Sequence, residues 1–163
     1  THIQKLINKY IEKTVLAEVD WDKIKFERFI FDNLSYEYTR NMTANRNTID
    51  KQIAIHLLKG IAEKRLRSQI ADLDRDEIKE FYQKAALKAI DDCWIDEVDS
   101  LQQLRAVVSS RQYAQRNPVF EYHKEAMQLF QEMRENCLKL LTRNILLSSV
   151  LRDEKNKLVL YFN

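Results

Sequence analysis

Glycine and proline are nearly absent from this sequence, which has one of each, Gly60 and Pro118, among 163 residues. Globular proteins contain about 7% glycine and 5% proline. Tight turns between β-strands rely on these residues, because such turns need positive or fixed φ angles. The sequence therefore predicts an all-α fold. Since 45% of the residues are hydrophobic, the chain is long enough to bury a real core.

The charges are nearly balanced, with 27 Lys and Arg against 25 Asp and Glu, a net charge of +2. No global field draws such a chain to nucleic acid or to anionic lipid, so neither is an expected partner. No apolar run approaches the ~20 residues that span a bilayer, and the N-terminus has no signal-peptide pattern. These features predict a cytosolic protein.

Apolar residues recur at helical spacing in the first half of the chain. The pattern predicts a helix from about Ile3 to Val15, a second from about Trp21 to Leu34 with Asp20 as its N-cap, and a third from Asn47 or Thr48 to Ile70. A polar loop should occupy residues 39–47. The segment 72–76 is the expected break between a first helical unit, residues 1–72, and a second, residues 73–163.

The second unit contains the longest pattern, which predicts a helix from about Asp76 to Ser109 and another beginning at Pro118 with Asn117 as N-cap. Two long helices joined by a short connection should be antiparallel, so that positions whose numbers sum to about 230 meet. The expected contact face of the first helix is Phe81, Leu87, Ile90, Trp94, Val98, Leu101, Leu104 and Val108, and that of the second is Tyr122, Ala126, Met127, Phe130, Met133, Cys137, Leu141 and Ile145.

The last residues, 157–163, are β-prone and are compatible with either a short strand or a tail packed on the surface. The sequence does not decide between them.

Most enzyme chemistry is hard to place on this chain. A phosphate-binding loop needs several glycines, and Gly60 is the only one, so no nucleotide site is expected. The acidic run Asp91, Asp92, Asp96, Glu97 and Asp99 resembles a cation site only superficially, and a solvated or partner-facing surface is the simpler interpretation. Cys93 and Cys137 have no ligand-spaced partner and are expected to be unbridged thiols. We expect no catalytic residue and no metal.

The connection between the two long helices is basic, with Arg111 and Arg116 around one aromatic residue, Tyr113, and with Gln112 and Gln115 beside it. An ordinary polar turn explains this composition. An exposed tyrosine among adaptable amides is also a good contact for varied peptide, because tyrosine supplies contact area at low entropy cost.

The same region resembles, without a gap, the two-helix finger of the SecA preprotein-translocase ATPases. The resemblance covers about residues 81–150 and includes the connection as well as the apolar spacing. Residues 1–72 are similar only in kind to the helical wing domain that precedes the finger in that family. The residues that carry the resemblance are Trp94, Leu104, Arg105, Arg111, Tyr113, Ala114, Gln115, Pro118, Glu121, Tyr122, Glu125, Phe130 and Met133.

The resemblance implies that the finger tip enters a SecY-type channel and that Tyr113 contacts the unfolded preprotein, with Arg111, Gln112, Gln115 and Arg116 as its neighbours. It also implies that the scaffold helix packs on the motor domains and restrains their ATPase. This motor-regulatory surface would comprise Trp94, Asp91, Asp92, Asp96, Asp99 and Arg105.

By the same resemblance, the chain is a piece of a longer ATPase whose motor, with ATP and magnesium, lies upstream, while the piece itself has no cofactor. The parent would be cytoplasmic and would attach peripherally to the inner face of the bacterial cell membrane through the channel. Glu97, Gln102, Val107 and Asn117 depart from the family's usual His, Asp, Gly and Asp. These departures, and a C-terminus without a Cys- and His-rich zinc tail, are typical of the accessory SecA type. A free-standing helical adaptor that binds partner helices is the alternative.

Overall fold

The computed structural model describes residues 2–37, 48–110 and 117–162. Within these ranges the chain is almost entirely helical, which confirms the predicted all-α class, and it ends in a short antiparallel pair of strands. The elements are α1 (His2–Ala17), α2 (Lys23–Asn33), α3 (Lys51–Ile70), α4 (Arg75–Ser110), α5 (Pro118–Leu146), β1 (Ser149–Arg152) and β2 (Leu158–Tyr161).

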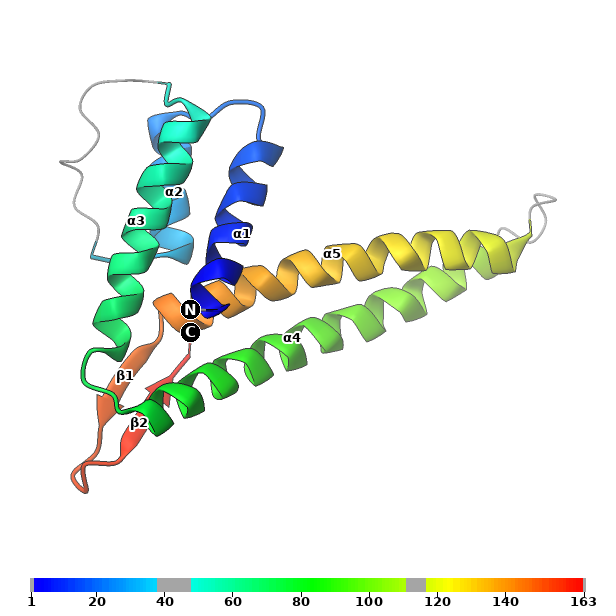
Figure 1. Ribbon diagram of the computed structural model, residues 1–163. Coiled ribbons are helices and arrows are strands. Elements are labelled where there is room, and N and C mark those ends of the chain that lie inside the picture. The colour runs from blue at the N-terminus through cyan, green and yellow to red at the C-terminus, as the bar shows by residue number, and fades with distance from the viewer. Residues whose placement is uncertain (1, 38–47, 111–116, 163) are drawn as a thin grey trace.

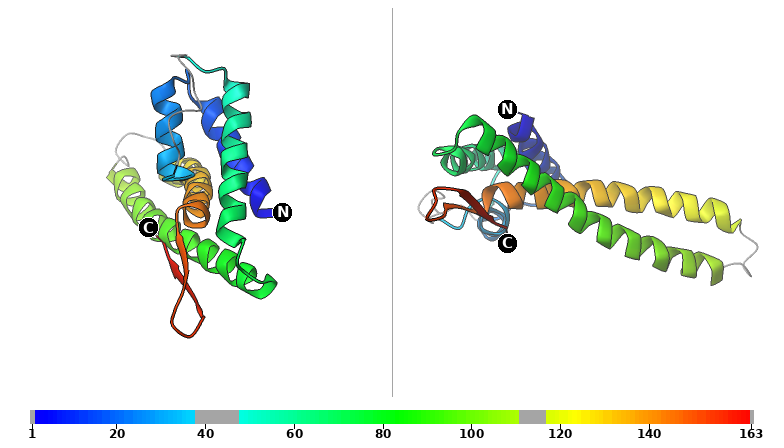
Figure 2. Two further views of the ribbon diagram at one scale, coloured as in Figure 1. Left: turned by 90° about the vertical axis from the view of Figure 1, so that its left-hand side faces the viewer. Right: turned by 90° about the horizontal axis from the view of Figure 1, so that it is seen from below.

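The molecule has two visibly different parts (Figure 1). Helices α1, α2 and α3 form a bundle beside one end of the α4–α5 pair. The antiparallel α4 and α5 then extend together well beyond that bundle, as the view from below also shows (Figure 2). The predicted arrangement of a helical bundle followed by a long two-helix hairpin is confirmed. We call the part of α4 and α5 beyond the bundle the projecting hairpin.

The helix starts differ from two predictions. Asp22, and not Asp20, is the N-cap of α2, since its carboxylate accepts from the Lys25 amide at 2.7 Å. Asp50 caps α3 in the same way, accepting from Gln52 and Ile53. Thr48 cannot begin α3, because its backbone pairs with that of Asp22 in an isolated β-bridge. Asn117, in contrast, caps α5 as predicted.

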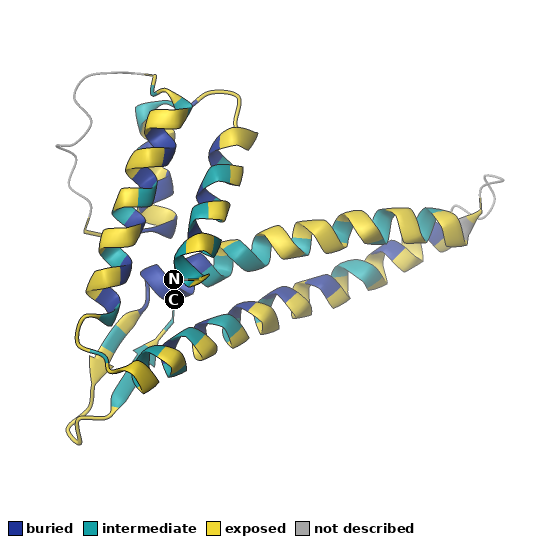
Figure 3. Cartoon of the chain, viewed as in Figure 1, coloured by how far each residue is buried: buried dark blue, intermediate teal, exposed yellow. Residues whose placement is uncertain are grey.

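One hydrophobic core joins the bundle to the base of the hairpin (Figure 3). Its fully buried members include Ile7 of α1, Leu58 of α3, Phe81 of α4 and Ile145 of α5. The helix break near residue 72 lies where the sequence placed it, between α3 and α4. The core nonetheless crosses that break, so residues on both sides stabilise the same structure.

Polar contacts fix the bundle to the end of α5. The buried Gln69 amide donates to the carbonyls of Ile145 at 2.9 Å and Ser148 at 2.8 Å, and Arg65 Nε donates to the Leu146 carbonyl at 2.7 Å. The Ile145 and Leu146 carbonyls belong to the last turn of α5, where carbonyls have no partner within the helix, and Ser148 lies just after it.

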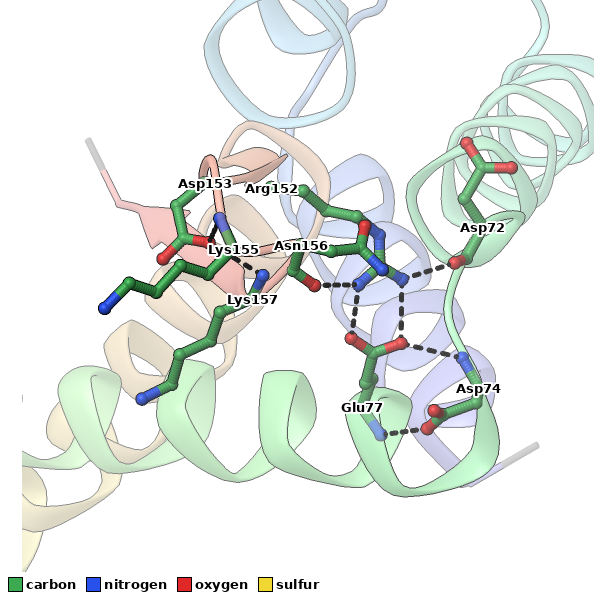
Figure 4. A network of polar contacts seen from close by, with 8 residues as sticks. All are labelled: Asp72, Asp74, Glu77, Arg152, Asp153, Lys155, Asn156 and Lys157. Atoms are coloured by element: carbon green, nitrogen blue, oxygen red, sulfur yellow. Dashed lines mark hydrogen bonds and ion pairs between the residues drawn. The ribbon is translucent and has the colours of Figure 1, made fainter.

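The C-terminal residues form a strand, and their partner is β1, which the sequence did not indicate. In the β1–β2 pair, Ser149 lies opposite Tyr161 and Arg152 opposite Leu158. Figure 4 shows how Arg152 holds the β1–β2 strand pair to the first turn of α4. Its guanidinium makes two hydrogen bonds to the Glu77 carboxylate, at 2.7 and 2.8 Å, and a third to the Asp72 carbonyl at 2.8 Å.

Among the described residues, no helix combines the length and the apolar character that crossing a bilayer requires.

Candidate functional site

Small side chains on α4 dominate its contact with α5 beside the bundle. The buried residues of α4 that face α5 along its middle are Ala85, Ala89, Cys93 and Glu97, one turn apart. Asn144 of α5 donates to the Ala85 carbonyl at 3.1 Å, and Asn136 Nδ2 lies 3.9 Å from Cys93 Sγ. The residue numbers of facing positions on α4 and α5 therefore sum to about 230, which confirms the predicted antiparallel register.

The predicted contact face of α4 is wrong over its middle turns, although Phe81, Leu104 and Val108 are buried as expected. Leu87, Ile90, Trp94 and Val98 are 44–59% exposed. The face toward α5 lies one residue earlier, at Ala89, Cys93 and Glu97, because small residues let two helices approach closely while large ones would hold them apart. Periodicity alone could not choose between these two adjacent stripes.

The four exposed residues Leu87, Ile90, Trp94 and Val98 follow one another at three- and four-residue steps and so share one face of α4. We call this face the α4 apolar stripe. Monomeric proteins rarely expose contiguous apolar surface of this kind unless it binds something. At about 100° per residue, the exposed residues Asp91 and Arg105 lie beside the stripe.

Asp92, Asp96 and Asp99 lie roughly opposite the stripe by the same helical geometry. Asp92 pairs with Lys88 at 3.2 Å, and Asp99 accepts from Gln103 at 3.1 Å. The structure thus divides the predicted motor-regulatory residues between two sides of one helix. Trp94, Asp91 and Arg105 can face a common partner, and the other three acids cannot reach the same flat surface.

Glu97 differs from these acids because it is only 5% exposed and faces α5. Burial raises the pKa of its carboxyl group, and the nearby Glu132 carboxylate raises it further. The two charges lie across the α4–α5 contact and disfavour each other.

Helix α5 carries a second apolar surface that sequence reasoning missed. Val119, Phe120, Met127 and Phe130 are 43–65% exposed and share one face of the helix. Met127 and Phe130 had been assigned to the contact with α4. We call this set the α5 apolar face. The sequence does contain a signal for this surface. Both long helices have more large apolar residues than one contact face can bury.

The residues predicted to contact substrate and channel, Arg111, Gln112, Tyr113, Gln115 and Arg116, lie outside the described residues. The structure describes only what flanks them. Helix α4 ends at Ser110, and α5 begins with Asn117 as cap and Pro118 in its first turn, at the end of the hairpin farthest from the bundle (Figure 1).

A groove of about 570 Å³ lies between α1, α4 and α5. Apolar residues of all three helices line it, together with three exposed basic residues, Lys9 and Lys13 on α1 and Arg134 on α5, and one exposed acidic residue, Glu135. Cys137 also lines the groove.

A metal centre finds no support in the part of the chain that the structure describes, since no three His, Cys, Asp or Glu residues there lie close enough to hold an ion. The two exposed apolar surfaces on α4 and α5 are of the kind that binds partners.

The sequence matches the SecA Wing and Scaffold domain family over residues 1–149. A protein translocase subunit SecA 2 from Streptococcus agalactiae serotype V is 44% identical over 152 residues, which cover 90% of this chain and 18% of that protein. A protein translocase subunit SecA 2 from Staphylococcus aureus strain Newman is 37% identical over 163 residues, which cover 96% of this chain and 20% of that protein.

The chain therefore spans about a fifth of the length of the curated relatives that it matches. The match covers the three-helix bundle and both long helices, so it applies to the projecting hairpin as well as to the core. This chain belongs to the SecA family and comprises its wing and scaffold region.

Proposed function

We propose that this chain serves protein translocation as the wing and scaffold part of an ATP-driven SecA-type export motor, and that its projecting hairpin contacts the translocating polypeptide and a SecY-type channel. Two lines of support are the family match and the names of the relatives, which are translocase subunits. The observation that carries the proposal is the hairpin itself, which extends from a packed base and exposes large apolar side chains.

The α5 apolar face has the chemistry that contact with an unfolded preprotein requires. An unfolded chain presents side chains of many shapes, and methionine and aromatic residues adapt to them without demanding one geometry. Phe120 stands in the first turn of α5, directly after the segment that contains Tyr113. Tyr113 and the α5 apolar face would form one contact surface, with Arg111, Gln112, Gln115 and Arg116 around it.

The α4 apolar stripe supports contact with motor domains of the same parent protein. Those domains would bind ATP and magnesium and would perform hydrolysis, while this part transmits or restrains their movement. The stripe, together with Asp91 and Arg105, is the side of α4 that we assign to the motor. Asp92, Asp96 and Asp99 are assigned to solvent or to another partner.

The SecA 2 relatives favour the accessory type of translocase, as the sequence departures do. In this proposal the parent protein works in the cytoplasm and attaches to the inner face of the cell membrane through the channel.

The test is translocation by the complete protein carrying Tyr113→Ala. We expect translocation to fall roughly tenfold, the effect of losing an aromatic contact of ~1.4 kcal/mol, with folding unchanged by circular dichroism. Phe120→Ala should reduce translocation in the same direction. Gln102→Ala, an exposed change on α4, is the matched control and should have no effect. Full translocation by the Tyr113→Ala protein would contradict the proposal.

A further inference from the structure

Two cysteines face each other across the α4–α5 contact, at the level of α1. Cys93 on α4 is buried and Cys137 on α5 is half-buried, and both are free. The Cys137 thiol donates to the Ala89 carbonyl at 3.8 Å, and the Asn136 amide donates to Cys93 Sγ at 3.9 Å. Cys137 thus contacts Ala89, one turn before Cys93, and Cys93 contacts Asn136, the residue before Cys137. These two contacts place the cysteines at the same level of the α4–α5 contact.

This position suits a bridge between the helices. Ala85 and Ala89 keep α4 close to α5 on the same line of contacts. A disulfide needs Cβ atoms about 3.5–4.5 Å apart, which facing residues of closely packed helices can provide. The two cysteines are far apart in sequence, and their approach is a product of the antiparallel register.

One of the two thiols is accessible from outside. Cys137 lines the groove between α1, α4 and α5, where three basic side chains, Lys9, Lys13 and Arg134, outnumber one acidic side chain, Glu135. An anionic small molecule is therefore attracted toward Cys137. Cys93 lies behind it, within the helix contact.

We propose that Cys93 and Cys137 are a dithiol modification site, at which an anionic low-molecular-weight disulfide oxidises the pair to a bridge joining α4 to α5. The Cys137 thiolate attacks one sulfur of the small disulfide, forms a mixed disulfide and releases one small thiolate. The Cys93 thiol then gives up its proton and attacks Cys137 Sγ, which releases the second small thiolate. Two protein thiols are oxidised, one small disulfide is reduced to two thiols, and the two protons from the cysteines end on those thiols.

The order of the two attacks follows from the environment of the thiols. Burial, and then the hydrogen bond with Cys137, raise the pKa of Cys93 to about 12, so that its thiol stays protonated near neutral pH. The accessible Cys137 therefore reacts first, and Cys93 acts only once a mixed disulfide stands beside it. The bridge would fix α4 and α5 in one register and prevent them from sliding or separating.

The experiment treats this chain with oxidised glutathione, an anionic disulfide, and maps its cysteines by mass spectrometry after non-reducing digestion. We expect a 93–137 peptide pair in the monomer, formed at a rate independent of protein concentration, and a thermal midpoint about 5–10 °C higher than in the reduced protein. Cys93→Ser should stop at a mixed disulfide on Cys137, and Cys137→Ser should remain unmodified.

Two results would overturn the proposal. One is a wild-type chain that retains a stable mixed disulfide on Cys137. The other is a chain that forms only bridges between molecules, which would show that the two sulfurs cannot meet. Because the peptide map of the wild-type chain decides between these results, the test holds even where a serine variant folds poorly.

Discussion

At the scale of single residues, Glu97 is held where its charge is disfavoured. It is buried in the α4–α5 contact, and Glu132 faces it from α5. A carboxyl group whose pKa is raised by folding stabilises the folded state below its ordinary pKa of about 4.3. That contribution is lost as the pH rises through the raised value.

Glu97→Gln should therefore stabilise the chain at pH 7 and change its stability little at pH 4, because glutamine keeps the shape without the charge. Urea unfolding at the two pH values measures this difference. The matched control is Glu132→Gln, which removes only the smaller of the two causes that raise the pKa of Glu97. It should therefore increase the free energy of unfolding at pH 7 by less than Glu97→Gln does. Equal effects of Glu97→Gln at both pH values would contradict the explanation.

Gly60 lies in the interior of α3, and a Cβ atom added there meets nothing within 4 Å. Gly60→Ala should stabilise the chain by about 1 kcal/mol, because alanine loses less backbone entropy in a helix. Thermal unfolding measures the gain. Gly60→Ser should give a smaller increase, and a loss of stability with alanine would contradict the entropy argument.

At the scale of elements, Arg152 connects β1 to the α3–α4 turn and to the first turn of α4. Its two hydrogen bonds to Glu77 are the main cause that lowers the pKa of that carboxylate. A lowered pKa means stabilisation that is present above about pH 4.3 and is lost as the pH falls through the lowered value. The strand pair should loosen in acid.

Arg152→Lys should loosen the strand pair at neutral pH as well, because lysine keeps the charge but cannot form the paired hydrogen bonds. Hydrogen exchange measures this as lost protection at the β1–β2 amides, with α2 unchanged. Lys155→Arg, at the turn between the strands, is the control and should have no effect. Full protection in Arg152→Lys would show that backbone pairing alone holds the strands.

At the scale of the whole molecule, the packed base and the projecting hairpin differ in where their large apolar side chains lie. The base has a continuous core from α1 to α5, and the hairpin exposes one apolar surface on each of its helices. Such surfaces are costly to leave in water, so each is expected to be covered when the parent protein works. The two surfaces can serve two partners.

A motor lacking this region should lose part of its ATPase rate when this chain is added in trans. The Trp94→Ala chain should need an about tenfold higher concentration for half-maximal repression, because it loses a central aromatic contact. Asp96→Ala, on the other side of the same helix, is the matched control and should repress as well as the unchanged chain. Equal repression by the Trp94→Ala chain would exclude the α4 apolar stripe as the motor contact.

The sequence alone determined the features that depend on local spacing. The scarcity of glycine and proline predicted helices, and the apolar repeats located the five helices of the described residues. Asn117 with Pro118 marked the start of α5. The antiparallel register was predictable because a short connection between long helices leaves little freedom.

Tertiary structure decided everything that depends on a choice between neighbouring faces. Ile90 and Trp94 form as regular a stripe as Ala89 and Cys93, and only close packing against α5 buried the smaller pair. The same holds for the strand partner of the C-terminal residues, since pairing with β1 depends on where α5 ends. Periodicity fixes which residues share a face, and the size and shape of what lies opposite decide which face is buried.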